Sequence, residues 1–326
     1  MKRIQFIILL LALTLTSFSY AQAKYDMVVA LDGSGDFTSL QAAINATKAF
    51  PPQRITIFIK NGTYHEKVNV YSWNTDLTLI GESAENTIIS YDDSFNKINL
   101  GRNSTFHTWT MKVEANNFKA ENLTIENTAG PVGQAVALHV EADCCVFRNV
   151  KILGNQDALY AAGMNCHQYY KDCYIEGTTD FIFGAATALF ENCIIHSKSN
   201  SYITAASTPE GVEFGYVFKE CKLTAAENIH AVYLGRPWRK YAKTVFIECE
   251  LGSHIVAEGW KEWSNSDDHS TTFYAEYKNI GPGADLTKRI TWSHQLSKKE
   301  FKKYSIENIL QSESNKNENN WKNIIH

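Results

Sequence analysis

The chain has 326 residues, of which 44% are hydrophobic and 20% are charged. This length and apolar content allow one elongated domain with a substantial core. The formal net charge of −4 argues against a general nucleic-acid-binding protein, because such proteins need an excess of basic residues to neutralise phosphates.

The first 23 residues have the pattern of a secretory signal peptide. Lys2 and Arg3 precede an apolar stretch from residue 4 to residue 15, and Ala21-Gln22-Ala23 provides a cleavage site of small residues. The apolar stretch is too short to cross a bilayer stably, so we expect no stable membrane insertion. We predict cleavage near Ala23 and a secreted protein, either extracellular or periplasmic.

A short helix is expected soon after the cleavage site. Ser39 is placed to cap an amphipathic helix over about residues 40–48, and Pro51-Pro52 ends it. Residues 55–59 and 77–80 read as buried strands. We expect the helix to cap the open end of the domain and to cover strand edges that would otherwise be exposed.

A six-residue pattern recurs through the centre of the chain. It has an aromatic or small residue first, a polar residue third, Cys or an aliphatic residue fourth, and Ile or Leu sixth. The copies start at Ala120, Phe147, Tyr170, Phe190, Phe218 and Phe246. The steps between them are 27, 23, 20, 28 and 28 residues, a period typical of solenoids whose coils stack on their neighbours.

The pattern alternates apolar and polar positions, which indicates β-strands. A leucine-rich repeat would show a leucine signature that is missing here, and a propeller blade needs about 40 residues. We therefore predict an all-β protein, a single-stranded parallel β-helix with coils about 4.8 Å apart. The first-position aromatic residues would form one inward ladder. A second inward ladder would contain Cys173, Cys193, Cys221 and Cys249.

Cysteine usage leaves two alternatives open. The chain has seven cysteines, and export would permit disulfides. Cys173 and Cys193 are neighbours on the predicted ladder, so a bridge between them is geometrically possible. Buried free thiols that act as small hydrophobic side chains are the alternative. No C-x-x-C pair suggests a metal site.

The repeat stops after Tyr277. Residues 296–310 are weakly helical, and we expect this helical tail to pack along the outside of the stack. The predicted organisation is a signal peptide over residues 1–23, a β-helix domain over residues 24–311, and a polar C-terminal tail over residues 312–326. We expect the protein to be a monomer.

Two aspartates occupy the same place in consecutive repeats. Asp157 and Asp180 each follow the fourth position by seven residues, and Gly154 and Gly177 each follow it by four. We expect the glycines to let the backbone bend sharply. Two carboxylates on adjacent coils cannot easily both ionise, so one would be a nucleophile or base and the other an acid. The pair suits acyl transfer or glycoside hydrolysis; aspartates that merely cap turns are the alternative.

Amide and cationic side chains accompany the aspartates. Gln156 directly precedes Asp157, and Gln134 lies one coil earlier; a side-chain amide is a neutral donor suited to an oxyanion. Arg236 and Trp238 lie on a bent loop. An arginine fork can orient a carboxylate, and an exposed Trp ring offers a platform for a sugar. Considered singly, a surface ion pair and a core aromatic would be the simpler interpretations.

Four blocks together resemble the signature of the pectin methylesterase family. In order, they are Gly133–Leu138, Gly154–Tyr160, Gly177–Gly184 and Leu234–Trp238, and Gly33–Phe37, Tyr274–Tyr277 and Ile306–Leu310 are similar to further family blocks. The resemblance covers roughly residues 25 to 325. It implies a right-handed parallel β-helix and a secreted carbohydrate esterase without metal or other cofactor. The implied partner is methyl-esterified homogalacturonan, the polygalacturonate of pectin.

The resemblance also assigns catalytic roles residue by residue. Asp180 matches the nucleophile that attacks the methyl ester carbonyl of a galacturonate unit. Asp157 matches the acid that protonates departing methanol and then the base that activates water. Gln156 and Gln134 match the amides that stabilise the tetrahedral intermediate, and Arg236 matches the arginine that holds the nucleophile.

Substrate contacts are assigned in the same way. Trp238 matches a substrate-contacting ring, and Thr105 aligns with a substrate-contacting threonine. The residues expected to bind substrate are Thr105, Gln134, Arg236 and Trp238. Because the polymer is anionic, we also expect local positive charge in the groove, from Arg239, Lys240 and Lys243 beside Arg236.

Three departures from the family pattern concern the surroundings of the site. His139 stands where the family usually has Arg, Ala158 stands where it has Thr or a similar residue, and residues 161–164 lengthen the segment between the aspartates. These changes bear on substrate preference. The alternative functions are another β-helix enzyme, a polygalacturonase or pectate lyase, and a non-catalytic binding module.

Overall fold

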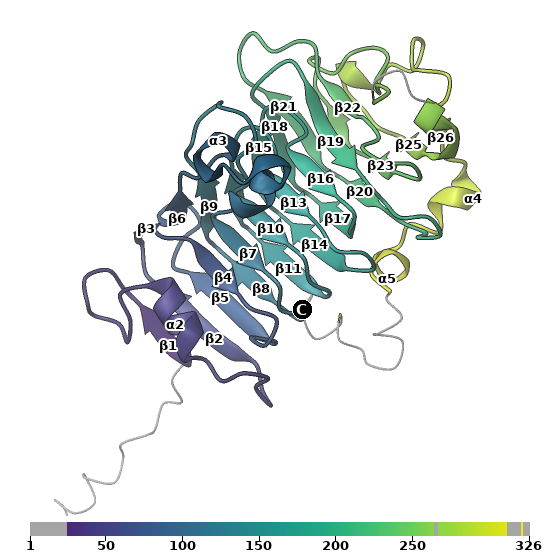
Figure 1. Ribbon diagram of the computed structural model, residues 1–326. Coiled ribbons are helices and arrows are strands. Elements are labelled where there is room, and N and C mark those ends of the chain that lie inside the picture. Colours follow the sequence, from purple (N-terminus) through teal and green to yellow (C-terminus); the bar gives the residue numbers. More distant parts are fainter. Residues whose placement is uncertain (1–24, 264–266, 312–320, 322–326) are drawn as a thin grey trace, which may run out of the picture.

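The chain folds into a parallel β-helix whose coils stack into three sheets (Figure 1). The computed structural model describes residues 25–263, 267–311 and 321. The predicted signal peptide and nearly all of the polar tail therefore lie outside the described residues. Strand pairing is parallel in all three sheets, which confirms the architecture that the repeat predicts.

Each coil contributes strands to more than one sheet. The eleven-stranded sheet contains, in spatial order, β1 (Met27–Val29), β2 (Ile55–Ile59), β5 (Leu77–Gly81), β8 (Lys119–Glu121), β11 (Cys145–Arg148), β14 (His167–Lys171), β17 (Thr187–Glu191), β20 (Tyr216–Lys219), β23 (Lys243–Ile247), β25 (Phe273–Tyr277) and β26 (His294–Gln295). The eight-stranded sheet contains β3 (Gly62–His65), β6 (Thr87–Tyr91), β9 (Thr124–Asn127), β12 (Lys151–Leu153), β15 (Tyr174–Gly177), β18 (Ile194–Ser197), β21 (Lys222–Ala225) and β24 (Glu250–Leu251). The seven-stranded sheet contains β4 (Val68–Val70), β7 (Met111–Val113), β10 (Leu138–Val140), β13 (Leu159–Ala161), β16 (Ile182–Gly184), β19 (Tyr202–Ala206) and β22 (Tyr233–Gly235).

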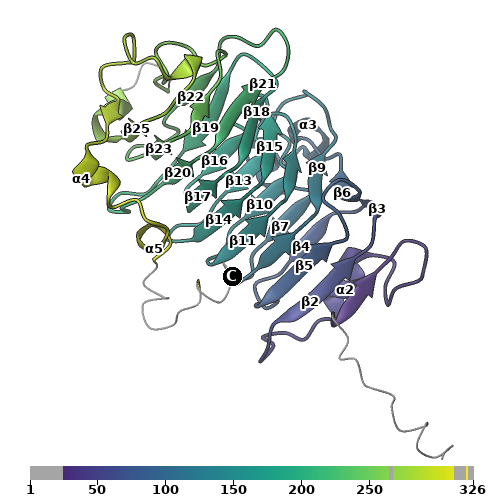
Figure 2. The ribbon, with the colours of Figure 1, turned by 180° about the vertical axis from the view of Figure 1, so that it is seen from behind.

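Helices are short and lie outside the stack. They are α2 (Leu40–Ala46), α3 (Phe95–Ile98), α4 (Lys298–Phe301) and α5 (Ile306–Ile309), with 3₁₀ helices η1 (Gly101–His107), η2 (Asp267–Thr271) and η3 (Pro282–Ala284). The two views of the ribbon show α2 at one end of the stack, beside β1 and β2, and α4 near the other end (Figures 1 and 2).

The predicted aromatic ladder runs through the interior. Phe147, Tyr170, Phe190, Phe218 and Phe246 are all fully buried. Their rings stack pairwise, with centroid distances of 4.9, 4.7, 4.5 and 4.4 Å along the series. Offset or parallel stacking at these distances adds to the stabilisation from buried apolar area, so the first repeat position fixes the spacing of the coils.

The cysteine ladder is also buried, and its thiols are free. Each sulfur lies within hydrogen-bond distance of a carbonyl oxygen on the preceding coil: Cys173 with Phe147 at 3.4 Å and Cys193 with Tyr170 at 3.4 Å. Cys173 and Cys193 are not bridged. Of the two alternatives, the structure favours buried thiols that fill space in the core.

The third repeat position forms the corner between the eleven-stranded and eight-stranded sheets. Its residues have left-handed φ angles between +50° and +55°. They are Asn122, Asn149, Asp172, Asn192, Glu220 and Glu248. Asn and Asp tolerate this conformation better than most other residues, and Asn149 Nδ2 donates to Asn122 Oδ1 at 2.9 Å. The sequence pattern shows only that this position is polar. The left-handed conformation of the corner is the physical reason for the preference for Asn and Asp.

Replacing Glu220 with Asn is expected to stabilise the stack. Glu220 holds φ at +55°, and asparagine should relieve part of that strain, by about 0.5–1 kcal/mol. Thermal unfolding should show a Tm about 1–3 °C higher. Glu227→Asn is the control, because Glu227 is exposed and lies outside the left-handed positions. Equal shifts in both variants would assign the effect to charge instead of backbone conformation.

The N-terminal helix caps the stack as expected. The Ser39 hydroxyl accepts a hydrogen bond from the Ala42 amide at 3.2 Å, and Leu40, Ala43 and Ile44 are buried. Helix α2 contacts β1 and β4 and ends at Ala46, two residues earlier than predicted. Its apolar face therefore covers the open end of the core.

The C-terminal tail forms two short helices instead of the one weak helix predicted. Residues 302–305 separate α4 from α5. Phe301 stacks on Tyr277 with a centroid distance of 4.4 Å, and Tyr304 contacts Phe214 edge-on at 5.3 Å. The tail thus packs on the outer face of the eleven-stranded sheet, in a second apolar cluster.

Candidate active site

The two aspartates lie in equivalent turns of adjacent coils. Register pairs Leu159 with Ile182, so Asp157 and Asp180 occupy the same place just before β13 and β16. Both side chains are buried, with 9% and 5% of the residue surface exposed. Both residues have left-handed φ angles, +65° and +49°, a conformation that costs free energy and is often found at functional sites.

Arg236 makes the two aspartates different. It follows β22, and its Nε and Nη2 donate to Asp180 Oδ1 and Oδ2 at 3.0 and 2.6 Å. Its guanidinium also lies 4.0 Å from the ring centroids of both Tyr202 and Trp263. A bidentate fork held between two aromatic rings fixes both oxygens of Asp180 in one orientation. No comparable cation pairs with the Asp157 carboxyl among the described residues.

The electrostatics of the pair follow from burial and this ion pair. Burial, and then the charge of Asp180, raise the pKa of Asp157 well above its ordinary value. Burial also raises the pKa of Asp180, but the hydrogen bonds and charge of Arg236 offset part of that effect. Arg236 therefore favours the ionised form of Asp180, whereas burial and the Asp180 charge favour the protonated form of Asp157.

The two glutamines border the same hollow. Gln134 and Gln156 lie opposite each other on adjacent coils, in a parallel bridge, and both line a hollow of about 380 Å³ that contains Asp157 and Asp180. Neither side-chain amide is held by a protein hydrogen bond within the part of the chain that the structure describes. Both amides are therefore available as donors to an oxygen atom inside the hollow.

Every candidate site residue borders this hollow. Thr105, Arg236 and Trp238 line it together with the aspartates and the glutamines. Comparison with known sequences identifies the family of the chain. The family model for pectinesterase matches residues 26–313. The chain belongs to the pectinesterase family. Membership and the shared hollow together make this cluster the candidate active site of a pectinesterase-family fold.

Curated relatives agree with the family. The chain is 39% identical over 276 residues to Pectinesterase 31 of Arabidopsis thaliana, a match that covers 82% of this chain and 86% of that protein. It is 40% identical over 281 residues to Pectinesterase/pectinesterase inhibitor PPE8B of Prunus persica, covering 82% and 53%. The chain therefore spans only about half the length of several curated relatives it matches.

Solved structures show the same fold. Pectin methylesterase from carrot matches with a TM-score of 0.83 at 30% identity, covering 89% of this chain and 94% of that one. A pectin methylesterase in complex with a hexasaccharide matches with a TM-score of 0.77 at 27% identity, covering 88% and 97%. The β-helix is thus the right-handed one of this family, the hand that parallel crossover connections adopt.

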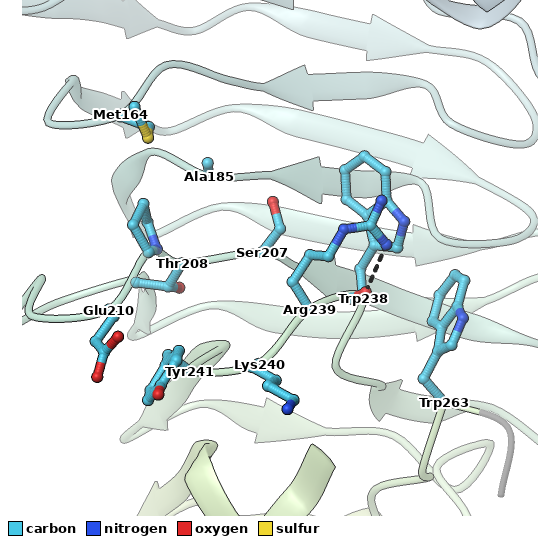
Figure 3. A pocket seen from close by; sticks show the side chains of 11 residues that line it. Met164, Ala185, Ser207, Thr208, Glu210, Trp238, Arg239, Lys240, Tyr241 and Trp263 are labelled. Atoms are coloured by element: carbon cyan, nitrogen blue, oxygen red, sulfur yellow. Dashed lines mark hydrogen bonds between the residues drawn. The ribbon is translucent and has the colours of Figure 1, made fainter. Parts of the chain in front are cut away.

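A second, larger hollow adjoins the first. It has a volume of about 690 Å³ and shares Trp238, Arg239 and Trp263 with the first hollow. Figure 3 shows these three side chains on one side of it, and Met164 and Glu210 on the other. The family site is therefore part of a longer groove, with aromatic rings and a cation at the junction.

The expectation of a basic groove is correct for two residues and wrong for one. Arg239 and Lys240 line the second hollow. Lys243 does not: its Nζ donates to the carbonyl oxygens of Val212 and Glu213 at 2.6 and 3.1 Å, and burial lowers its pKa. Arg102, which no sequence motif indicates, lines the hollow around the two aspartates and contributes positive charge there instead.

The glycines before the aspartates have a different role from the one predicted. Neither Gly154 nor Gly177 has a left-handed φ. A Cβ at Gly177 would lie 2.2 Å from Phe181 Cβ, and one at Gly154 would lie 2.7 Å from Ala158 Cβ. Glycine is needed for close packing against the turn, and the left-handed bend falls on the aspartates themselves.

The departures from the family pattern lie around the hollow instead of at its reacting groups. His139 is 3% exposed and lies against the Tyr160 ring with a centroid distance of 4.6 Å, and burial lowers its pKa. Met164, in the longer segment, is 73% exposed and lines the second hollow. The longer segment therefore reaches the rim of the groove.

Two kinds of feature are not found among the described residues. Among residues 25–263 and 267–311, no group of three or more His, Cys, Asp or Glu side chains is arranged to hold a metal ion. In the same described ranges, no helix is long and apolar enough to cross a membrane.

Proposed function

We propose that this pectinesterase-family protein is a pectin methylesterase, which hydrolyses methyl esters of galacturonate units in homogalacturonan to methanol and pectate. The observation that carries the proposal is the asymmetric pair of aspartates, one paired with Arg236 and one not. The two amides beside the pair and the family match support it.

In the first half-reaction, the ionised Asp180 attacks the ester carbonyl carbon. The carbonyl electron pair moves onto oxygen, and the amides of Gln134 and Gln156 stabilise that oxyanion. The intermediate collapses as the Asp157 carboxylic acid gives its proton to the methoxy oxygen. Methanol leaves, and the galacturonyl group stays on Asp180 as a mixed anhydride.

In the second half-reaction, the roles of Asp157 reverse. Its carboxylate removes a proton from water, and the resulting hydroxide attacks the galacturonyl carbonyl of the anhydride. The bond to Asp180 breaks, galacturonic acid is released and loses its proton to bulk water, and Asp180 is again a carboxylate beside Arg236. Because the proton has returned to Asp157, both carboxyls have regained their starting states.

Product analysis tests this function against its alternatives. Incubation with highly methylated pectin should release methanol without new reducing ends and without unsaturated products. Reducing ends would indicate a polygalacturonase, and unsaturated products that disappear with a calcium chelator would indicate a pectate lyase. Polymer binding with no product of any kind would indicate a binding module, and each of these outcomes would contradict the proposal.

The pH dependence should be bell-shaped. Methanol release requires Asp180 ionised and Asp157 protonated, so kcat/KM should rise as Asp180 deprotonates and fall as Asp157 deprotonates. Both limbs should lie above the ordinary aspartate value of 3.8, because both pKa values are raised. Arg236→Gln should move the acidic limb to higher pH, because Arg236 lowers the pKa of Asp180.

Arg239→Gln is the matched control for this pH profile. Arg239 also lines the catalytic hollow, but its Nη1 donates to the Trp238 carbonyl and not to Asp180. Its removal should leave the acidic limb in place. If both variants move that limb equally, general positive charge and not the Arg236 fork sets the ionisation of Asp180.

We further propose that the protein acts after export, on pectin outside the cytoplasm. The N-terminal pattern of basic, apolar and small residues supports this. N-terminal sequencing of the exported protein should give Lys24 as the first residue. A mature protein that retains residues 1–23 would contradict the proposal.

A further inference from the structure

One buried amide holds together the backbone around the catalytic hollow without lining it. Asn127 is the last residue of β9 and is 4% exposed. Its Nδ2 lies 2.9 Å from the Asp93 carbonyl oxygen, and 3.1 Å from those of Thr108 and Val136. Its Oδ1 accepts a hydrogen bond from the Ala129 amide at 3.0 Å, which fixes the orientation of the side chain.

The carbonyl groups of Thr108 and Val136 belong to segments that line the hollow through Thr105 and Gln134, and the Asp93 carbonyl belongs to the segment before α3. Thr108 caps η1, which carries Thr105. Val136 follows Gln134 by two residues, and its amide donates to Thr108 Oγ1 at 2.9 Å. Asp93 directly precedes Ser94, the N-cap residue of α3. Asn127 therefore joins segments that are far apart in the sequence at a single point.

The link to Gln134 is direct. The amide of Phe95, in α3, donates to the Gln134 carbonyl oxygen at 2.9 Å. Gln134 is therefore held on one side through α3 and on the other through Val136, and both connections meet at Asn127. Because the Gln134 side chain has no protein hydrogen bond among the described residues, its place in the hollow depends on its backbone.

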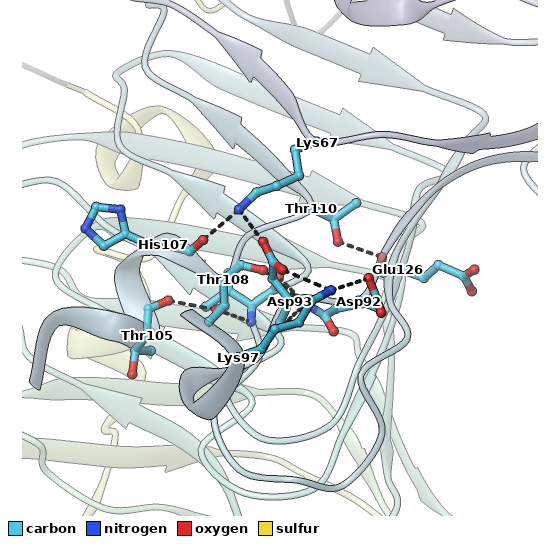
Figure 4. A network of polar contacts seen from close by, with 11 residues as sticks. Lys67, Asp92, Asp93, Lys97, Thr105, His107, Thr108, Thr110 and Glu126 are labelled. Atoms are coloured by element: carbon cyan, nitrogen blue, oxygen red, sulfur yellow. Dashed lines mark hydrogen bonds and ion pairs between the residues drawn. The ribbon is translucent and has the colours of Figure 1, made fainter. Parts of the chain in front are cut away.

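An ionic network supports the same segments from outside (Figure 4). Lys67 Nζ lies 2.7 Å from Asp93 Oδ2 and donates to the His107 carbonyl oxygen at 2.7 Å. Lys97 lies 3.3 Å from Asp93 Oδ1. Lys67 thus connects the Asp93 turn to the end of η1, so two independent contacts hold these segments in one arrangement.

We propose that Asn127 is a positioning residue for the oxyanion donor Gln134, acting through the Asp93, Thr108 and Val136 backbone. The inference rests on the proposed function, because it concerns the role of Gln134 in ester hydrolysis. An oxyanion donor contributes only when its amide lies within hydrogen-bond distance of the developing charge. A displacement of about 1 Å can reduce the rate by about 100-fold.

Asn127→Ala tests the proposal, with Gln168→Ala as the matched control. Gln168 is another fully buried amide, whose Nε2 donates to the Val140 and Ala162 carbonyls away from the hollow. Asn127→Ala should lower kcat by about 10- to 100-fold with KM changed less than about threefold. Gln168→Ala should lower Tm to a similar extent and change kcat less than about threefold.

A double-mutant cycle separates positioning from general destabilisation. In a Gln134→Ala background the donor is already lost, so Asn127→Ala should reduce kcat by less than about threefold. An equal loss in both backgrounds would overturn the proposal, as would an unchanged kcat in the single variant. Asn127→Gln keeps the amide on a side chain that is one methylene longer. If this amide displaces the three carbonyl groups, kcat should stay low even where Tm recovers. A kcat that follows Tm alike in Asn127→Ala and Asn127→Gln would assign Asn127 a merely structural role and overturn the proposal.

Hydrogen exchange gives a readout that does not depend on activity. Backbone amides of residues 101–110 and 134–138 should exchange faster in Asn127→Ala than in the wild type. In Gln168→Ala their exchange rates should equal those of the wild type. Unchanged exchange in Asn127→Ala would overturn the proposal even for an active enzyme. If the wild type released no methanol from pectin, the proposed function would fail, and the exchange data would still decide whether Asn127 holds these segments.

Discussion

Asp180→Asn should abolish methanol release from methylated pectin, with a loss in kcat on the order of 10⁴-fold or more. The substitution keeps the shape of the side chain and suits the left-handed backbone at φ +49°. It removes the charged oxygen that attacks the ester, and an amide cannot form the mixed anhydride. Steady-state kinetics with a methanol assay would measure the loss directly.

Asp172→Asn is the control for Asp180→Asn. Asp172 also has a left-handed φ, +54°, and it sits on the same coil, but its Oδ1 accepts from Asn192 Nδ2 in the corner ladder. The same loss of one charge there should leave kcat within about twofold. Activity retained by Asp180→Asn would contradict the covalent mechanism, whereas activity lost by both variants would indicate damage to the fold.

Asp157→Asn should reduce methanol release by about 10²- to 10⁴-fold, because it removes the proton donor for the leaving group and the base for water. A galacturonate ester with a p-nitrophenolate leaving group needs no proton on departure. With that ester, the first half-reaction of Asp157→Asn should return towards the wild-type rate. The second half-reaction should stay slow, because the variant still lacks the base for water. Mass spectrometry should then detect a galacturonyl group on Asp180, and an equal loss on both esters without a covalent adduct would contradict the assignment.

The stability of Asp157→Asn distinguishes a catalytic loss from unfolding. In the wild type, burial and the Asp180 charge raise the pKa of Asp157 in the folded state well above that in the unfolded state. Folding therefore opposes ionisation, and wild-type stability falls as pH rises above the unfolded pKa towards the folded pKa. Asn cannot ionise, so at neutral pH the Tm of the variant should equal or exceed that of the wild type.

The fold follows from the sequence because its core is periodic. Phe147, Tyr170 and Phe190 stack in one interior ladder. Their spacing in the sequence is therefore enough to predict stacked coils. The strand expected at residues 55–59 is β2 as observed. The left-handed conformation of the third position could not be predicted from the sequence. The pattern shows hydropathy, whereas Asn and Asp are favoured at this corner because they tolerate a left-handed backbone.

The sequence repeat predicts only part of the candidate site. The stacked aspartates follow from periodicity. Arg236 lies on a loop outside the repeat, so its contact with Asp180 is predicted only by the general chemistry of an arginine fork and by the family resemblance. Tyr202 and Trp263, which hold the guanidinium, have no signal in the repeat, since aromatic residues are common throughout this chain. The prediction that Lys243 lies in the groove is wrong, because proximity to Arg236 in the sequence does not determine which face of β23 a residue occupies.

The left-handed conformation of Asp157 and Asp180 has a consequence for how the site accommodates its reaction. A short side chain on a backbone of fixed, sparsely populated geometry has few directions in which to point. The two carboxyl groups are oriented in the folded protein in the absence of substrate. The free-energy cost of the left-handed backbone is part of the free energy of folding, when adjacent coils pack together. In the proposed mechanism, the chemical step would therefore need little rearrangement of the protein.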